Sequence, residues 1–398
     1  MSELSYLEKL LDGVEVEWLP LGEITKYEQP TKYLVKAKDY HDTYTIPVLT
    51  AGKTFILGYT NETHGIYQAS KAPVIIFDDF TTANKWVDFD FKAKSSAMKM
   101  VTSCDDNKTL LKYVYYWLNT LPSEFAEGDH KRQWISNYSQ KKIPIPCPDN
   151  PEKSLAIQSE IVRILDKFTA LTAELTAELN MRKKQYNYYR DQLLSFKEGE
   201  VEWKALEEVS DIYDSLHQTP QYSKNGLSMI RVTDIKNGYI DLKNTLKVND
   251  GIFSIFTKKY LPQKNDLVMS RVGSYGNVGI IPTDNSACMG KNTVVIHPHI
   301  NNRYLFYILT SSIGQDFIEK NVGGGSQKTL SLKSIKSIPI PLTGESEQSK
   351  IVSILDKFDT LTNSITEGLP REIELRQKQY EYYRDLLFSF PKPETVSN

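Results

Sequence analysis

The sequence is short of cysteine, of long apolar runs and of net charge, and each shortage excludes a class of protein. Its 398 residues include three cysteines, Cys104, Cys147 and Cys288, which are scattered and form no CxxC pair. This spacing argues against a zinc site or a disulfide framework and is typical of a reducing compartment. No apolar run reaches the roughly 18 residues of a membrane helix. The N-terminus MSELSYLEKL carries acids instead of a cleavable apolar segment. We therefore expect a cytoplasmic protein with no signal peptide and no membrane partner.

The net charge of −2 argues against a nucleic-acid partner only if the charge is evenly spread. Trp18 to Pro151 holds 16 basic and 15 acidic residues, whereas Trp203 to Pro341 holds 16 basic and 11 acidic residues. The excess of acids lies elsewhere, at both termini and at 197–202. Globular parts that contact DNA, beside helical parts that avoid it, would give this distribution. A small positive excess is also common in domains that bind no DNA.

Catalytic signatures are missing as well. The Asn/Asp-Pro-Pro-Tyr/Phe string of adenine methyltransferases does not occur. The glycines of VGSYGNVG at 272–279 lack the dinucleotide-binding spacing and indicate a loop or bulge. TAGKT at 50–54 resembles the end of a phosphate loop, but a strand pattern follows it, so we expect no phosphate site there. His297 and His299 lack a third ligand nearby in the sequence, which favours a surface loop over a metal site.

The most informative feature that is present is a duplicated segment. ILDKF occurs at 164–168 and again at 354–358, and QYNYYRD at 185–191 recurs as QYEYYRD at 379–385. Apolar residues around both copies keep the alternating spacing of four and three that is typical of a helix packed along another helix. We therefore predict two long helices that pair with each other, in preference to two unrelated surface helices. Their seam residues are Ile164, Phe168, Leu171, Leu175, Leu179, Tyr186 and Tyr189 in the first copy, and Ile354, Phe358, Leu361, Tyr380 and Tyr383 in the second.

Two globular segments alternate with these helices, and each ends in the motif IPIP, at 143–146 and 338–341. Alternating prolines hold an extended chain, so each motif marks a stiff exit toward the next helix. Serines then signal the helix starts, at Ser154 in the first copy and at Ser346 and Ser349 in the second. Outside these anchors the two segments share almost no side chains, as expected of one scaffold that carries two different readers.

Within each globular segment, short runs of β-branched and aromatic residues precede a stretch of helical length. The predicted strands of the first segment are Thr45–Leu49, Phe55–Thr60, Val74–Phe77, Trp86–Phe91 and Ala97–Val101, before a helix at Leu110–Leu121. Those of the second are Met229–Val232, Tyr239–Leu242, Asp266–Arg271, Val278–Pro282 and Thr293–His297, before a helix at Tyr304–Thr310.

Together these motifs resemble the specificity subunit of type I restriction-modification systems over essentially the whole chain. LTAELTAEL at 171–179 is close to diagnostic of the class called type IC. The resemblance implies an α+β fold with an internal pseudo-twofold repeat, in which two β-rich target recognition domains with small helices are separated by two long antiparallel helices that form a coiled-coil spacer. The implied divisions are an N-terminal part of the repeat at 1–17, which packs near the helices, recognition domains at 18–151 and 199–341, long helices at 152–198 and 342–390, and a flexible tail at 391–398.

The resemblance also implies the partners. In that family each recognition domain reads one half of a split double-stranded DNA target, and the helices dock two modification (M) subunits that methylate adenine with S-adenosylmethionine. Restriction (R) subunits add translocation and cleavage that use ATP and Mg. This chain is then expected to bind no cofactor or metal and to hold no catalytic residue.

The second helix departs from the family pattern. NSITEGLPREIELRQ stands where the first copy has its TAEL units, and Gly368 with Pro370 should end or kink a helix. We predict a break near 367–371, with helix on both sides.

Candidate residues for DNA contact follow from side-chain chemistry. Arginine and lysine neutralise phosphates or bind guanine edges, whereas asparagine and glutamine suit adenine. The candidates are Asn84, Lys85, Lys131, Arg132 and Gln133 in the first domain, and Arg231, Arg271, Ser274, Tyr275, Asn277, Lys291, Asn292, Gln327 and Lys328 in the second. Superposing the IPIP motifs places Lys131 and Arg132 on Ser326 and Gln327. Each residue alone is better explained as part of a solvated loop, and only the clustering favours an interface.

The length of the first long helix suggests that it sets the distance between the two DNA half-sites, as a ruler would. One four-residue TAEL unit adds about 6 Å of rise and about 40° of rotation to a helix, and one base pair adds about 3.4 Å and about 35° to DNA. We therefore predict that one TAEL unit changes the distance between the half-sites by one base pair. Two alternatives stay open: a coiled-coil scaffold without salt-dependent affinity for DNA, and a DNA enzyme with unrecognised catalytic residues, active as the isolated chain.

Overall fold

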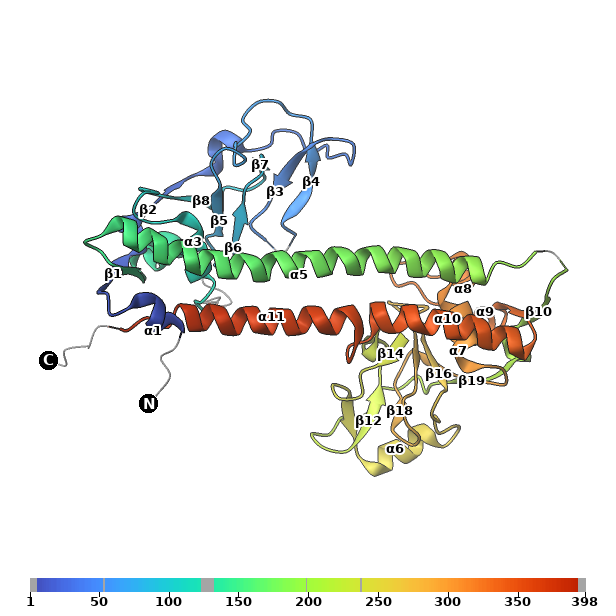
Figure 1. Ribbon diagram of the computed structural model, residues 1–398. Coiled ribbons are helices and arrows are strands. Elements are labelled where there is room, and N and C mark those ends of the chain that lie inside the picture. The colour runs from blue at the N-terminus through green and yellow to red at the C-terminus, as the bar shows by residue number, and fades with distance from the viewer. Residues whose placement is uncertain (1–5, 53, 123–131, 198, 237, 393–398) are drawn as a thin grey trace. The chain divides into compact units, whose positions relative to one another are not determined.

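The structure is a computed structural model that describes residues 6–52, 54–122, 132–197, 199–236 and 238–392 (Figure 1). The chain forms two compact units, Met1–Ala173 with Leu375–Asn398, and Glu174–Glu374, and each is described by itself. Lys131 and the last six residues of the tail lie outside the described ranges. Within those ranges, no helix combines the length and the apolar character needed to cross a membrane.

The first unit contains one β-rich domain, the start of one long helix and the end of another. Its helices are α1 (Tyr6–Leu11), α2 (Leu21–Ile24), α3 (Leu111–Leu118), α4 (Gln133–Ser136), the first part of α5 (Pro151–Leu193) and the last part of α11 (Gly368–Leu387). Its strands are β1 (Val16–Pro20), β2 (Thr25–Glu28), β3 (Ile46–Leu49), β4 (Ile56–Thr60), β5 (Val74–Asp78), β6 (Asn84–Val87), β7 (Lys92–Ala93), β8 (Met98–Ser103) and β9 (Lys142–Pro146).

The second unit contains the other β-rich domain with the remaining parts of the long helices. Its helices are the rest of α5, α6 (Asp250–Thr257), α7 (Asn302–Thr310), α8 (Ser312–Asn321), α9 (Leu332–Lys336), α10 (Glu345–Asn363) and the start of α11. Its strands are β10 (Glu202–Ala205), β11 (Ser210–Asp214), β12 (Leu227–Ile230), β13 (Ile235–Lys236), β14 (Gly238–Ile240), β15 (Leu246–Val248), β16 (Leu267–Ser270), β17 (Val278–Ile280), β18 (Ala287–Met289), β19 (Thr293–Pro298) and β20 (Pro339–Leu342).

The two β-rich domains share one strand topology. The sheet β2-β8-β5-β6 of the first corresponds to β11-β19-β16-β17 of the second, which β14 and β13 extend. The sheet β4-β3-β7 corresponds to β15-β12-β18, and in both sheets the central strand has one antiparallel and one parallel neighbour. A two-stranded ribbon, β1-β9 or β10-β20, completes each domain. The predicted α+β fold and its internal repeat are confirmed, even though the two domains share few side chains.

Each IPIP motif forms the second strand of a ribbon. Its isoleucines, Ile143 and Ile145 in one copy and Ile338 and Ile340 in the other, are buried in the main core of their unit. Prolines donate no backbone hydrogen bond, and a two-stranded ribbon tolerates them because one edge of the strand is unpaired. Alternating isoleucine and proline therefore places the isoleucine side chains on the inward face, while the prolines lie at the unpaired edge, where no N–H is needed.

Tyrosines of the helix that follows the sheet hold each ribbon in place. The Tyr113 hydroxyl of α3 donates to the carbonyl oxygen of Pro144 at 2.7 Å, and the Tyr304 hydroxyl of α7 donates to that of Pro341 at 2.8 Å. Both tyrosines are fully buried. The same bond thus fixes the exit strand in both units.

A second tyrosine ties the same helix to the long helix of its unit. Tyr116 donates to Asp166 of ILDKF at 2.5 Å, and Tyr307 donates to Asp356 of the other ILDKF, also at 2.5 Å. Arg303 adds an ion pair to Asp356 at 2.7 Å. Burial raises the pKa of both tyrosines, so their hydroxyls stay protonated and remain donors. The aspartate of ILDKF is therefore a docking point for the globular domain.

Aromatic contacts connect α5 to the C-terminal helices within each unit. Phe168 stacks on Tyr383 with ring centroids 5.2 Å apart, and Tyr189 stacks on Phe358 at 5.5 Å. Each contact joins α5 to a C-terminal helix inside a single unit. The buried stripe of α5 in the core of the first unit contains Ile161 and Leu165, and Leu165 lies one position after the predicted seam residue Ile164.

The long helices differ in continuity. α5 is unbroken over 43 residues. The second stretch is interrupted between Asn363 and Gly368, where Gly368 adopts a positive φ of 77°. This interruption lies slightly before the predicted break near 367–371.

Some predicted boundaries were wrong. α5 begins at Pro151 instead of Ser154, because the Asn150 side chain accepts a hydrogen bond from the backbone N–H of the third residue after it. The predicted strand Trp86–Phe91 is wrong in its second half, since β6 ends at Val87.

Candidate nucleic-acid interface

In the first domain, a tight turn between β5 and β6 presents two of the candidate residues. The Asp78 carboxylate accepts a hydrogen bond from the Phe80 N–H at 2.8 Å, and the Asp78 N–H donates to the Ala83 carbonyl at 2.8 Å. Asn84 and Lys85 follow as the first residues of β6. Lys85 is exposed, and Asn84 Oδ1 is buried without a hydrogen-bond partner among the described residues. The turn therefore exposes one cation and holds one buried amide oxygen without a partner among the described residues.

Asp79 brings the start of α4 to this turn. Its carbonyl accepts a hydrogen bond from the Gln133 N–H at 2.9 Å, and its carboxylate accepts one from the Trp134 N–H at 3.0 Å. The second carboxylate oxygen lies 3.2 Å from the Lys99 ammonium and 3.9 Å from the Arg132 guanidinium. Arg132 has 49% of its side chain exposed. The structure thus places Arg132 and Gln133 beside the turn, although they lie about fifty positions further along the chain.

In the second domain, Arg271 joins the segments that carry the candidates. Its N–H donates to the Asn292 carbonyl at 2.8 Å, and its carbonyl accepts from the Leu330 N–H at 2.8 Å. Its guanidinium bonds both Asp214 oxygens at 2.7 Å and the Leu330 carbonyl at 3.1 Å. Asn292 is half-buried with a φ of +69°. The turn before β19, the loop after β16 and the segment before α9 therefore meet at one arginine.

The loop after β16 is closed by its own hydrogen bonds. Gly273 donates its N–H to the Lys328 carbonyl at 3.3 Å, and Gly276 donates to the Ser270 carbonyl at 2.9 Å. Both glycines have positive φ, a conformation that side chains rarely adopt. The predicted loop at VGSYGNVG is thus present. The candidate side chains that remain exposed around it are Ser274, Asn277, Lys291, Gln327 and Lys328.

Three partly buried candidates already have partners inside the protein, and the exposed Lys328 also pairs with Glu319 at 3.5 Å. Arg231 bonds both carboxylate oxygens of Asp234, at 3.0 and 3.1 Å. Arg271 is held as described above and has 12% of its side chain exposed. The Tyr275 hydroxyl donates to Glu319 at 2.7 Å, and this bond raises the pKa of the tyrosine. These three are placed to organise the surface, whereas the exposed set is placed to contact a ligand.

The candidate patches of the two domains occupy the same topological position. In the first domain the patch combines the β5–β6 turn with Arg132 and the start of α4. In the second it combines the β16–β17 loop with the segment before α9. β5 and β16 are equivalent strands, as are β6 and β17. Two domains of one topology therefore present two chemically different polar surfaces at one site.

Sequence reasoning missed the residues behind these surfaces. Asp79, Lys99 and Asp214 were not candidates, because acids repel DNA and a lysine inside a strand pattern carries no positional signal. It also missed residues 216–225, LHQTPQYSKN, a largely exposed polar segment that begins two residues after Asp214. Its signal was a loop rich in amide and basic side chains between two strands.

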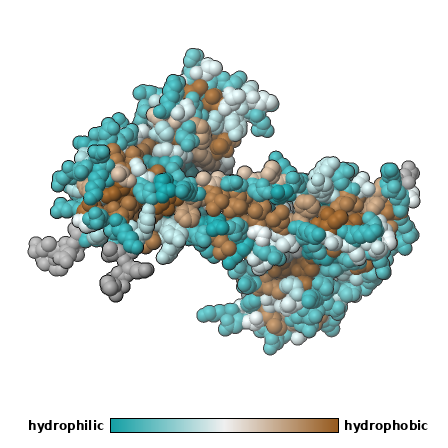
Figure 2. All heavy atoms as spheres, viewed as in Figure 1, coloured by the Kyte–Doolittle hydropathy of each residue, from teal (hydrophilic) through white to brown (hydrophobic). Residues whose placement is uncertain are grey.

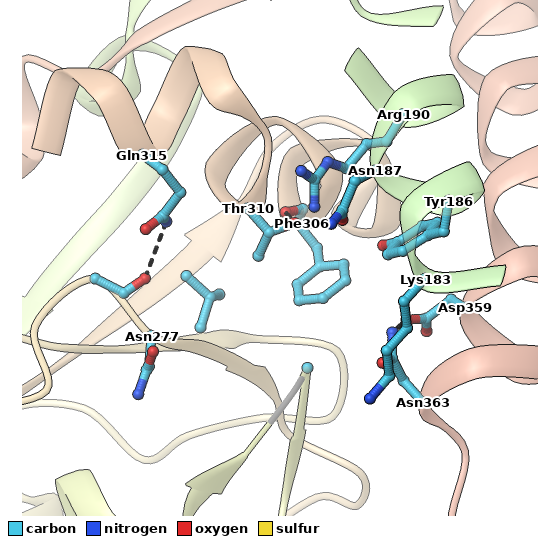
Figure 3. A pocket seen from close by; sticks show the side chains of 13 residues that line it. Lys183, Tyr186, Asn187, Arg190, Asn277, Phe306, Thr310, Gln315, Asp359 and Asn363 are labelled. Carbon is cyan, nitrogen blue, oxygen red and sulfur yellow. Dashed lines mark hydrogen bonds between the residues drawn. The ribbon is translucent and has the colours of Figure 1, made fainter. Parts of the chain in front are cut away.

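A cavity of about 370 Å³ lies beside the candidate loop in the second unit (Figure 3). Lys183, Asn187 and Arg190 line it from α5, where their spacing of four and three puts them on one helix face. Gln315 of α8 lines the other side and donates to the Gly276 carbonyl at 3.2 Å. Polar groups of the long helix therefore lie next to the loop that carries Asn277.

The two histidines excluded as a metal site each pair with one carboxylate. His297 Nδ1 lies 2.7 Å from Asp266, and His299 Nε2 lies 3.0 Å from Asp211. No group of three potential metal ligands occurs in the part of the chain that the structure describes.

Comparisons with known proteins agree with this architecture. The chain matches the protein family described as "Type I restriction modification DNA specificity domain" over residues 13–182 and 198–375. It is 69% identical to the Escherichia coli type I restriction enzyme EcoR124I/EcoR124II specificity subunit, over 100% of both chains. It is 35% identical to the Escherichia coli EcoprrI specificity subunit, over 92% of this chain and 93% of the relative. The crystal structure of the S subunit of a type I restriction-modification system from M. genitalium shares the fold, with a TM-score of 0.54 at 13% identity, over 96% of this chain and 98% of that one.

Proposed function

Because the chain belongs to the type I restriction-modification DNA specificity family, we propose that each of its β-rich domains reads one half of a split double-stranded DNA target. The chain is a specificity subunit, the non-catalytic member of such a system. One observation carries the proposal: loops at the same topological position expose different polar side chains in the two domains. Two readers of two different half-sites need this arrangement.

We assign the recognition domains to residues 18–151 and 199–341, and the spacer helices to 152–198 and 342–390. Within the interface, exposed lysine and arginine suit phosphates, and exposed asparagine and glutamine suit base edges. Lys85, Lys291 and Lys328 are therefore proposed as phosphate contacts. Asn277 and Gln327 are proposed as base contacts.

The test is methylome sequencing of cells that express the chain with its modification subunit. A split adenine-methylated motif is the expected result. Gln327→Ala should relax one base position in one half of that motif by about 5-fold to 150-fold, the usual range for one bidentate base contact. Lys259→Ala, which removes an exposed side chain just after α6, should leave the motif unchanged. If the purified complex shows no salt-dependent affinity for any duplex, the chain is a scaffold instead.

We further propose that α5 measures the distance between the half-sites. Its support is the unbroken helix through the two TAEL units, in which Leu171 and Leu175 are not fully buried. A helix without a break transmits both the rise and the rotation of an inserted unit. One added TAEL unit should therefore lengthen the gap in the methylated motif by one base pair.

A length-preserving change gives the matched control for the ruler. Replacing one TAEL by Ala-Lys-Glu-Leu keeps four helical residues, and the spacing should stay the same. A spacing that ignored the insertion, or that changed with the replacement, would contradict the ruler.

We also propose that the duplicated tyrosine pairs dock two copies of one modification subunit. Tyr188 and Tyr189 meet edge to face at 5.4 Å and 75°, and Tyr382 and Tyr383 meet at 5.3 Å and 78°. The outer ring is 61% exposed in the first pair and 64% exposed in the second. Figure 2 shows hydrophobic residues at the surface of the long helices as well as in the β-rich parts. Two identical exposed aromatic pairs fit two identical partners, since exposed tyrosines are common interface anchors.

Native mass spectrometry of the complex tests this docking. Tyr188→Ala should weaken the binding of one modification subunit, and Tyr382→Ala should weaken the binding of the other. Each variant should therefore form a complex with a single copy. Ile255→Ala is the control, because Ile255 is 58% exposed on α6 and has no counterpart in the other domain. Two bound copies in both tyrosine variants would refute the docking site.

We propose that the partner subunits supply S-adenosylmethionine binding and the ATP- and Mg-dependent steps. Equilibrium dialysis of the purified chain should then detect no S-adenosylmethionine binding. Binding by the chain alone would favour an enzyme with unrecognised catalytic residues.

A further inference from the structure

An ionic side chain occupies the same place in both recognition domains. Asp79 directly follows β5, and Arg271 directly follows β16. β5 and β16 are equivalent in strand order, and the loop that each residue opens carries candidate DNA contacts. The two positions are thus equivalent in topology but opposite in charge.

Asp79 connects the DNA-contact segment of the first domain to its core. Through its carbonyl and carboxylate it accepts both leading amides of α4, those of Gln133 and Trp134. Lys99 reaches it from β8, and neither side chain of this pair is exposed. Arg132, which does project to solvent, precedes the two anchored amides. The buried pair therefore fixes the backbone from which Arg132 extends.

In the second domain Arg271 holds the candidate segments in the same way, but the positions of the positive and the negative side chain are exchanged. The cation now follows the strand, and the anion, Asp214, comes from the end of β11. The guanidinium uses separate nitrogens for Asp214 and for the Leu330 carbonyl, so it joins β11 to the segment that leads from Gln327 and Lys328 into α9. Because the two contacts use separate nitrogens of one rigid planar group, they fix its orientation as well as its position.

Stability does not explain the first pair. The cost of removing two charges from water offsets most of their attraction. A protein with apolar side chains of similar volume at these positions is commonly as stable. Neither Lys99 Nζ nor Asp79 Oδ2 makes a hydrogen bond within the described residues, so even the expected compensation is incomplete. An apolar pair, however, offers no acceptor for the Trp134 amide. What the ion pair supplies is a fixed acceptor at the base of the loop.

We propose that Asp79–Lys99 and Arg271–Asp214 are positioning pairs, each of which holds the DNA-contact segments of its own domain in the geometry that reads one half-site. The inference rests on the proposed function. Neither pair contacts DNA, and each acts through the backbone that it holds. Because each pair lies within one domain, each controls one half-site only.

The split target provides an internal control for the experiment. Cells express the whole chain with its modification subunit, and single-molecule methylome sequencing gives the motif. Arg271→Lys keeps the charge but loses the fork, so discrimination should fall about tenfold or more at one or more positions of one half-site. The other half-site should stay unchanged. Asp79→Asn keeps an acceptor oxygen but loses the ion pair with Lys99 that fixes it, so this variant should relax the opposite half-site and spare the first.

Arg303→Lys is the matched control for a purely structural effect. Arg303 also makes paired ionic contacts, to Asp356 and Asp359 at 2.7 and 3.1 Å, but they join α7 to α10. This variant should lower the amount of methylation at most and leave both half-sites intact.

Each outcome decides the matter. A wild-type chain that yields no split motif refutes the proposed function itself. A wild-type split motif with variants that change both halves, or neither half, refutes the positioning pairs alone. If Arg271→Lys abolishes methylation, the test is repeated with Asp214→Asn, which removes the same ion pair by changing its partner on β11. One relaxed half-site then supports the proposal, and an unchanged motif or a second complete loss overturns it.

Discussion

The hydroxyls of Tyr113 and Tyr304 offer a direct test of how the globular domains are fastened. Each is fully buried and donates to a proline carbonyl of its IPIP strand, at 2.7 and 2.8 Å. Burial raises the pKa of Tyr304 to about 12, so the hydroxyl keeps its proton and stays a donor at neutral pH. Tyr113→Phe and Tyr304→Phe each remove one oxygen and change little else.

The size of the effect follows from burial. The lost bond is worth about 1 kcal/mol net, and the carbonyl left behind loses a buried partner, which brings the total to about 2 kcal/mol. Since about 1.4 kcal/mol corresponds to a factor of ten, backbone amides that exchange through this opening should exchange about thirtyfold faster.

Hydrogen–deuterium exchange of the full complex measures this change locally. Tyr113→Phe should accelerate exchange in α3 and spare α7, and Tyr304→Phe should do the reverse. Tyr222→Phe, at a partly exposed ring, should change neither helix. Equal acceleration in both helices, or none in either, would show that these bonds do not fasten the domains independently.

Three further predictions concern reactivity, packing and pH. In the folded chain, alkylation followed by peptide mass spectrometry should detect modification of Cys104 alone, because Cys104 is exposed whereas Cys147 and Cys288 are buried. Burial also raises the pKa of Cys288 to about 12. Gly314→Ala should cost about 2 kcal/mol in urea unfolding, since its added carbon would meet two backbone carbonyl oxygens. Gly323→Ala, with open space around it, should cost far less. The hydrogen bonds that Glu160 accepts from an arginine one turn further on lower its pKa to about 2. The stabilisation that these bonds provide is therefore complete above about pH 4.3 and is lost as the pH falls toward 2. Glu160→Gln should make the melting temperature less dependent on pH across that window.

Local pattern predicted the helices better than the sheets. The duplicated heptads specify long helices because each position reports its own face of the helix. α6 was missed although Asn249 caps it, because its short apolar run fits a strand equally well. β6 was placed late because Trp86 and its apolar neighbours continue a strand pattern beyond Val87, while the strand itself begins at the polar Asn84.

The sequence could predict which side chains have the chemistry to contact DNA, but not which of them are already paired inside the protein. Sequence reasoning correctly predicted a loop at VGSYGNVG, and it chose several side chains that lie together in the described structure. It could not distinguish Arg271 from Lys291, because the partner of Arg271 lies 57 positions away in the chain. Nor could it find Asp79, whose function depends on a lysine in another strand. Ion pairing over long sequence separations is a property of the fold, and no local pattern reports it.

The boundaries of the sequence repeat do not coincide with the compact units, and this mismatch has a physical reason. The first unit takes its final helical turns from the C-terminal end of the chain, and the core around Leu11 includes Phe388 and Phe390. The Trp18 indole donates to the Pro391 carbonyl at 2.9 Å, which joins the two ends of the chain within one unit. In the second unit the corresponding Leu194 directly follows α5 in the chain. The duplicated element is therefore completed in both units, once by a continuous stretch of chain and once by two separate ends of the chain.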